Sequence, residues 1–286
     1  MSWPDLKDDH PLLRLHAKLP QILEEAAHDR IWGLTLSAES PPAFSTLLVL
    51  QKYLRSVSDD VEQAATALAR TLKWRKEFGL DGAGLQAGTG KTEEEYGPDF
   101  DGLGYVTIVK HNGKAEIVTW NVYGAVKSLK STFGDLDRFL RWRVALMERA
   151  ISHLHLESTT MPIPDYCSNT VDPHRIAQVH LYEGVSFLRM DPHVKAASKA
   201  TIEIMSAHYP EMLSRKFFVG VPLIMSWMFT AMKLIISAET AKKFVVISYK
   251  ENLAAELGDA EGVPAEYGGK GPDLKHLENV LESRDA

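Results

Sequence analysis

From residue 105 onward the chain alternates short β-type runs with helical sequence, and this alternation limits its fold more than any other feature. The runs lie at residues 105–110, 117–123, 176–182, 217–221 and 244–248. The first two flank His111-Asn112-Gly113-Lys114, a strong hairpin signal. The others are separated by helical sequence, which requires crossover connections. We therefore expect an α/β fold with a mostly parallel five-stranded sheet and crossover helices.

The first 80 residues have a different pattern, in which apolar residues recur at helical spacing. This periodicity predicts helices at Leu12–Ala27, Ser45–Leu54 and Val61–Phe78, followed by a connecting loop over Asp81–Gly104. We expect a helical lobe over residues 1–100 and a second lobe, with a C-terminal extension, over residues 101–286. In the second lobe, Asp135–Leu156 predicts a long amphipathic helix with Asp135 as its N-cap.

Composition excludes several classes of protein. The 286 residues include 32 Lys plus Arg and 38 Asp plus Glu, and a net charge of -6 argues against a nucleic-acid partner. With Cys167 as the one cysteine, no internal disulfide can form, which fits a reducing compartment. The acidic N-terminus has no apolar run typical of a signal peptide. These features predict a cytoplasmic protein, with no indication of its oligomeric state.

The longest apolar stretch is residues 219–236, which Pro222 interrupts. A membrane-spanning helix needs about 20 apolar residues, so this segment is too short to span a bilayer. A helix that is apolar all round is either buried in a core or faces lipid. Both interpretations stay open from the pattern alone.

The run Arg175–Tyr182 predicts a strand with two unlike faces. Because side chains alternate along a strand, Gln178, His180 and Tyr182 share one face and an apolar set shares the other. His180 and Tyr182 would lie about 6.6 Å apart along the strand. A tyrosine phenolate suits ferric haem. The alternative is a tyrosine and a histidine that meet buried partners in the wall of the domain.

Three separate motifs resemble the CRAL-TRIO lipid-transfer superfamily, in its order and spacing. Residues 72–78 (LKWRKEF) resemble the last helix of its N-terminal lobe, and residues 208–222, from His208-Tyr209-Pro210-Glu211 to Pro222, its helix-to-strand junction. Residues 263–270 (VPAEYGGK) resemble its closing signature. Residues 118–124, 141–143 and 179–186 are most similar to the non-classical, haem-binding phosphatidylinositol transfer branch of fungi.

The resemblance implies a CRAL-TRIO fold with a gate helix over an apolar pocket. It also implies phosphatidylinositol transfer and a bound ferric haem b. Tyr182 would be the ligand of the iron, with His180, Arg175 and Gln178 as further cofactor-binding residues. Such a protein would act in phosphoinositide homeostasis or in oxidant or haem stress. The alternatives are a haem-dependent redox enzyme, similar to a peroxidase or catalase, and a lipid-sensing scaffold without haem.

The lipid site that the resemblance implies lies elsewhere in the chain. Lys243 matches a lysine that contacts the phosphoinositol headgroup, and Trp227, Met228 and Phe229 lie in the gate. In the family, this gate touches the membrane when it opens, which implies transient peripheral contact with the endoplasmic reticulum or microsomes. We expect a binding protein rather than an enzyme. Some members place a tyrosine near the haem where this chain has Val57, so the sequence leaves open whether a second axial ligand of the haem exists.

Overall fold

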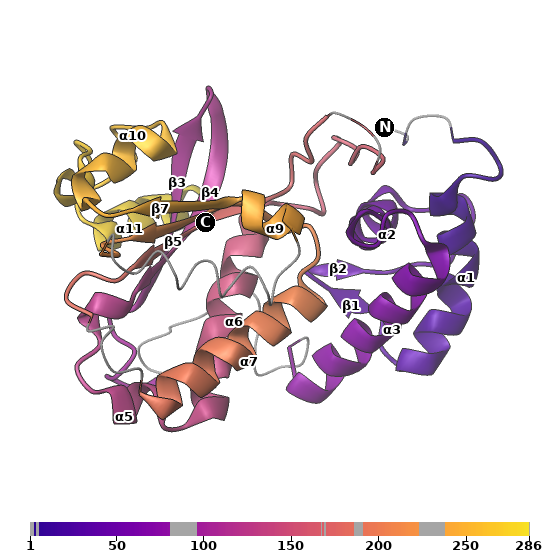
Figure 1. Cartoon of the computed structure of the whole chain (residues 1–286). Helices are drawn as coiled ribbons and strands as arrows, with labels where there is room; N and C mark the ends of the chain where they lie inside the picture. Colours follow the sequence, from indigo (N-terminus) through magenta and orange to yellow (C-terminus); the bar gives the residue numbers. More distant parts are fainter. Residues whose placement is uncertain are drawn as a thin grey trace. The chain divides into compact units, whose positions relative to one another are not determined.

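The computed structural model describes residue 3 and residues 6–80, 96–166, 168, 170–185, 191–222 and 238–285 (Figure 1). The chain divides into two compact units. Unit 1 consists of Met1–Gly90, Leu154–His174 and Glu203–Met212. Unit 2 consists of Lys91–His153, Arg175–Ile202 and Leu213–Ala286. Two segments from the second half of the sequence therefore belong with the N-terminal helices, which a single boundary near residue 100 does not describe.

Unit 1 contains the three helices that periodicity predicts: α1 (Pro11–Ala26), α2 (Phe44–Ser56) and α3 (Val61–Phe78). Helix α3 begins where the Asp60 side chain accepts a hydrogen bond from the Gln63 amide, and it ends at Gly79 in the left-handed region. The sequence analysis missed a short antiparallel pair between α1 and α2, β1 (Arg30–Ile31) and β2 (Leu34–Thr35). Two-residue strands are too short to produce a period-2 pattern.

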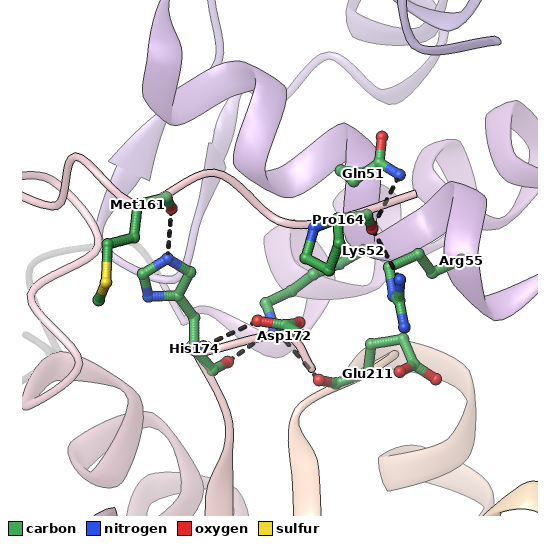
Figure 2. A network of polar contacts seen from close by, with 8 residues as sticks. All are labelled: Gln51, Lys52, Arg55, Met161, Pro164, Asp172, His174 and Glu211. Carbon is green, nitrogen blue, oxygen red and sulfur yellow. Dashed lines mark hydrogen bonds and ion pairs between the residues drawn. The ribbon is translucent and has the colours of Figure 1, made fainter. Parts of the chain in front are cut away.

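A buried ammonium group holds three segments of unit 1 together. Lys52 of α2 donates to the Asp172 carboxylate at 2.8 Å, the His174 carbonyl at 2.7 Å and the Glu211 carbonyl at 3.1 Å (Figure 2). The side chains of Lys52 and Asp172 are 1% and 0% exposed. In the sequence, His174 lies just before the strand that begins at Ile176, and Glu211 lies just before the strand that begins at Leu213. Lys52 therefore fixes the position of the segments that precede these two strands.

Unit 2 is built on the predicted five-stranded sheet, in the order β3-β4-β5-β6-β7. Its strands are β3 (Gly104–His111), β4 (Lys114–Val122), β5 (Ile176–Leu181), β6 (Leu213–Val219) and β7 (Phe244–Ile247). The β3–β4 pair is antiparallel, and the other three pairs are parallel. At the hairpin, Asn112 and Gly113 both have positive φ, which a two-residue type I′ turn requires.

The helical segments of unit 2 connect the strands and cover the sheet. They are η1 (Tyr123–Ala125), α5 (Leu129–Phe133), α6 (Leu136–Ser152), α9 (Ala238–Lys242), η3 (Lys250–Asn252), α10 (Leu253–Leu257), η4 (Ala265–Tyr267) and α11 (Leu274–Asp285), while α7 (Pro192–His208) ends in unit 1. Asp135 caps α6 as predicted, accepting from the Arg138 amide at 3.0 Å. The prediction that this helix continues to Leu156 is wrong, because it ends at Ser152 and His155 has a positive φ.

One face of the sheet is apolar and packs against the C-terminal part of the chain. This core includes Val118, Trp120, Val179, Leu181, Phe217, Val219 and Ile247 from the strands, with Leu253, Leu257, Val263, Tyr267 and Leu274 beyond them. In Figure 1, α10 lies on this side of the sheet and α6 on the other, and α11 contacts the edge strand β3, where Glu278 accepts a hydrogen bond from the Val106 amide at 2.7 Å. The alternation of apolar and polar faces that the sequence predicts for β5 is therefore present, and β4 and β6 show it as well.

The gate cannot be compared with its prediction, because residues 223–237 lie outside the described part of the chain. Over the residues that the structure does describe, we find no helix with the length and apolar character needed to cross a bilayer.

Replacing Lys52 with Met should lower the free energy of unfolding by about 3–5 kcal/mol, because the Asp172 carboxylate would stay buried without its cation. Urea denaturation at pH 7, followed by circular dichroism, measures this loss. Lys18→Met is the matched control, since it breaks an ion pair with the exposed Glu62 and should cost less than about 1 kcal/mol. Equal losses in the two variants would contradict a structural role for Lys52.

Candidate ligand-binding site

The second face of the sheet carries three of the predicted site residues, Gln178, His180 and Tyr182. Strand register places these side chains on it: Thr119 and Asn121 of β4, Gln178 and His180 of β5, Lys216 and Phe218 of β6, and Phe244 of β7. Tyr182 follows β5 directly, and its amide donates to the Val219 carbonyl at 2.9 Å, which continues the strand pairing. We call these eight residues the polar face.

Four rings meet at the carboxyl end of β5. The His180 and Tyr182 ring centroids lie 6.3 Å apart, close to the separation expected along a strand. Tyr123, from η1, lies 5.6 Å from His180 and 5.5 Å from Tyr182. Phe218 is nearly parallel to Tyr182, at 12° and 6.4 Å. Together they form an aromatic surface suited to a flat or apolar ligand group.

Two glycines, Gly124 and Gly220, lie against the backbone at Tyr182 and Glu183. A Cβ at Gly124 would collide with the carbonyl oxygen of Glu183, the residue after Tyr182. Gly220 has φ +75, lies against Glu183 and Tyr182, and donates to the Ile247 carbonyl at 2.8 Å. The ends of β4, β5 and β6 can approach one another here only because these two positions lack side chains.

Three buried polar atoms of the polar face have no hydrogen-bond partner within the described ranges: Thr119 Oγ1, Asn121 Oδ1 and His180 Nε2. They come from two neighbouring strands, and Asn121 pairs in register with His180. Buried polar atoms are usually satisfied, and those that are not often face a ligand or water. The polar face therefore offers hydrogen-bonding capacity that the described protein residues do not use.

The electrostatics of this face are set by burial and by two cations, Arg143 of α6 and Lys216 of β6. Burial, then Lys216 and Arg143, hold the pKa of His180 well below its usual value, so the imidazole is neutral at pH 7. Burial and the neighbouring Tyr123 raise the pKa of Tyr182, against the effect of Arg143. Burial and Arg143 lower the pKa of Lys216 to about 7.

These residues fit a haem. A phenol, a neutral imidazole with an unused nitrogen and flat aromatic neighbours are the groups expected beside a ferric porphyrin. The raised pKa of Tyr182 means that the phenol keeps its proton until a cation such as iron stabilises the phenolate. Over the described residues, no group of three or more His, Cys, Asp or Glu side chains could bind a metal ion directly.

The structure brings together only some of the site residues that the sequence predicts. Gln178, His180 and Tyr182 share the polar face, and Gln178 donates to the Met147 sulfur of α6 at 3.7 Å. Arg175 precedes the first residue of β5, so it lies at the opposite end of the strand from Tyr182. Lys243 lies just before β7, where its carbonyl accepts from the Lys216 amide at 2.8 Å. Trp227, Met228 and Phe229 lie outside the described residues.

Four residues of the site were missed as candidates: Tyr123, Arg143, Lys216 and Phe218. Lys216 and Phe218 could have been found, because they alternate along β6 as His180 and Tyr182 do along β5. Arg143 lies one helical turn from Met147, the contact of Gln178. Tyr123 gives no such signal, since it lies in a short 3-10 turn after β4.

A surface hollow of about 580 Å³ lies elsewhere, in unit 1, and contains none of the predicted site residues. Lys18 and Glu25 of α1 and Lys73 and Trp74 of α3 line it together with His208. Ion pairs already join Lys18 to Glu62 and Lys73 to Glu25 across it. These ion pairs therefore neutralise the charges of Lys18 and Lys73 within the hollow.

The second unit is thus a five-stranded α/β domain with one packed apolar face and one face that carries polar and aromatic side chains. Residues 103–269, which span the sheet and its C-terminal cover, match the family model described as the CRAL/TRIO domain. The chain belongs to this family.

Within the family, the chain belongs to the fungal branch of the SFH5 proteins. It is 69% identical over 285 residues to "Phosphatidylinositol transfer protein SFH5" of Cryptococcus neoformans var. neoformans serotype D, covering 99% of this chain and 94% of that one. The protein of the same name from Phaeosphaeria nodorum is 48% identical over 280 residues, with 96% and 81% covered. The structure titled "Crystal structure of Sfh5" superposes with a TM-score of 0.75 at 26% identity, covering 100% of this chain and 99% of that one.

Acidification should destabilise the protein through histidines that the fold keeps neutral, among them His180, His174 and His208. The pKa values of these histidines are lower in the folded state than in the unfolded state. Their contribution to the free energy of unfolding is therefore fully present above pH 6.5, about the pKa of an unfolded histidine, and is lost as the pH falls below that value. Each of these histidines lowers the free energy of unfolding by up to about 1.4 kcal/mol for each pH unit below that value. Urea titrations from pH 8 to pH 5 should show a smaller fall for His180→Gln than for wild type. The exposed control His193→Gln should follow wild type, and parallel curves for all three proteins would rule out this effect of His180.

Proposed function

We propose that this protein binds and transfers phosphatidylinositol between membranes and holds ferric haem b on the polar face of its sheet. The observation that carries the proposal is the ring cluster of Tyr123, His180, Tyr182 and Phe218, in which His180 Nε2 is buried and has no hydrogen-bond partner among the described residues. Such a cluster belongs to a ligand site rather than to a packed core.

The lipid part of the proposal is supported by the family and by the names of its relatives. Proteins up to 69% identical along nearly the whole chain are named phosphatidylinositol transfer proteins. A lipid leaves a bilayer only if its acyl chains find another apolar environment, at about 25 cal/mol per Å² of surface removed from water. Lys243 would contact the headgroup phosphate, as a lysine point charge does well.

The haem part rests on the chemistry of this chain's own residues. Tyr182 would supply an oxygen ligand, His180 would hydrogen-bond beside it, and Tyr123 and Phe218 would pack against the macrocycle. A tyrosine-held ferric iron, when bound, favours the oxidised state. Because burial opposes ionisation of Tyr182, its phenolate would need the positive charge of a bound ferric iron to be stabilised. We propose binding and transfer rather than redox catalysis as the main activity.

The protein would work in the cytoplasm and touch the endoplasmic reticulum or microsomal membranes transiently. A chain with a net charge of -6 lacks the positive charge that holds proteins on anionic lipid. Membrane contact would then depend on residues 219–236, whose sequence is apolar. Phosphoinositide homeostasis and haem or oxidant stress are the processes that this combination of ligands would serve.

Tyr182→Phe should abolish or greatly reduce haem content, because it removes the ligating oxygen and keeps the ring that packs on Phe218. The visible absorption spectrum of protein purified from haem-supplemented cells measures the occupancy. Tyr249→Phe, at a side chain that is 68% exposed, is the matched control and should retain haem. A Tyr182→Phe protein with full haem content and an unshifted spectrum would refute Tyr182 as the ligand. A colourless wild-type protein would leave phosphatidylinositol transfer as the function.

Lys243→Ala should weaken phosphatidylinositol transfer between vesicles more than it weakens haem retention, because its charge addresses a phosphate. A loss of about tenfold in transfer corresponds to one charge-assisted contact. The exposed Lys130→Ala of α5 serves as the control. Transfer at the wild-type rate would remove Lys243 from the headgroup site, whereas equal losses of both ligands would point to a folding defect.

A further inference from the structure

Strand β3 lies at one edge of the five-stranded sheet, so half of its backbone hydrogen-bonding groups point away from its neighbour β4. In the antiparallel hairpin, His111 and Lys114 flank the two-residue turn and form its closing pair. Counting back from His111, every second residue directs its amide toward β4. The amides of Val106, Ile108 and Lys110 therefore point outward, and such an edge can pair with the strand of another chain.

Two carboxylates from the C-terminal part of the chain lie against this edge. Asp259 Oδ2 accepts a hydrogen bond from the Lys110 amide at 2.7 Å, and Glu278 Oε1 accepts one from the Val106 amide at 2.7 Å. A charged acceptor forms a stronger hydrogen bond with an amide than a neutral carbonyl does. Two of the three outward amides are therefore bonded within the chain, where a sixth strand would otherwise bond them.

Further contacts hold both carboxylates in place. Glu278 of α11 forms an ion pair with Arg149 of α6 at 2.8 Å, and these side chains are 13% and 9% exposed. Beside Asp259, a Cβ at Gly262 would lie 3.1 Å from the Ile108 carbonyl oxygen and would collide with the Asp259 carboxylate. The chain after α10 can approach the edge this closely because Gly262 has no side chain. The C-terminal segment thus follows β3 along the positions whose amides point outward.

We propose that residues 258–285 cap the β3 edge, and that a chain without the carboxylates of Asp259 and Glu278 pairs with a second copy of itself through β3. A second copy fits this edge because the outward amides lie symmetrically about Ile108. Two β3 edges can therefore meet antiparallel about a two-fold axis, and each supplies the donors and acceptors that the other needs. Such a dimer is closed, since each copy uses its one β3 edge.

The test removes the two acceptors and measures the mass of the chain in solution by light scattering after size-exclusion chromatography. The uncapped variant carries Asp259→Leu and Glu278→Leu, and a conservative variant carries Asp259→Asn and Glu278→Gln, which keep an acceptor oxygen at each position. The matched control, Glu256→Leu with Glu282→Leu, places two leucines at exposed positions of α10 and α11. Ile108→Pro is added to wild type and to the uncapped variant, because proline removes an outward amide and is tolerated on an edge strand.

The uncapped variant should be folded by circular dichroism and should have twice the mass of wild type. Adding Ile108→Pro should return it to the wild-type mass, and the conservative variant, the matched control and Ile108→Pro alone should all keep that mass. A folded uncapped variant with the wild-type mass would overturn the proposal, as would a dimer that survives Ile108→Pro. An uncapped variant that does not fold would also overturn it, since the two carboxylates would then belong to the core rather than to a cap.

Discussion

The structure of unit 2 depends on the alternation of side chains along β5. This strand is paired on both sides and buried on both faces, so each side chain lies either in the apolar core or on the polar face. Val179 and Leu181 pack into the core, which places His180 and Tyr182 opposite. A slip of one residue would exchange the two sets, so the core that stabilises the sheet also determines the register of the site.

The two units satisfy their buried charges in different ways. In unit 1, Lys52 is neutralised by Asp172 and by two backbone carbonyls, so the network is complete within the protein. In unit 2, Arg143 and Lys216 accompany a histidine that the fold keeps neutral. A complete network stabilises a fold, whereas buried groups with strongly shifted pKa values are typical of functional sites. This contrast is why we place function on the sheet and assign Lys52 a structural role.

Local patterns predicted the elements well, because helical and strand periodicities reflect which residues are buried. The three N-terminal helices, the hairpin at Asn112-Gly113 and the five-stranded sheet followed from them. Helix ends and the site were harder. No pattern marks the end of α6 at Ser152, and Tyr123 and Arg143 join the site from separate elements through packing that no local spacing encodes. Most of the ligand chemistry came from family resemblance, and only the pairing of His180 with Tyr182 came from the strand itself.

Native mass spectrometry tests the central claim most directly. The purified chain would be incubated with haemin and, separately, with vesicles that contain phosphatidylinositol, and its mass would then be recorded under non-denaturing conditions. The account predicts a species heavier by one haem after the first treatment and one heavier by a single phosphatidylinositol molecule after the second. A folded chain that keeps its unliganded mass after both treatments would contradict it.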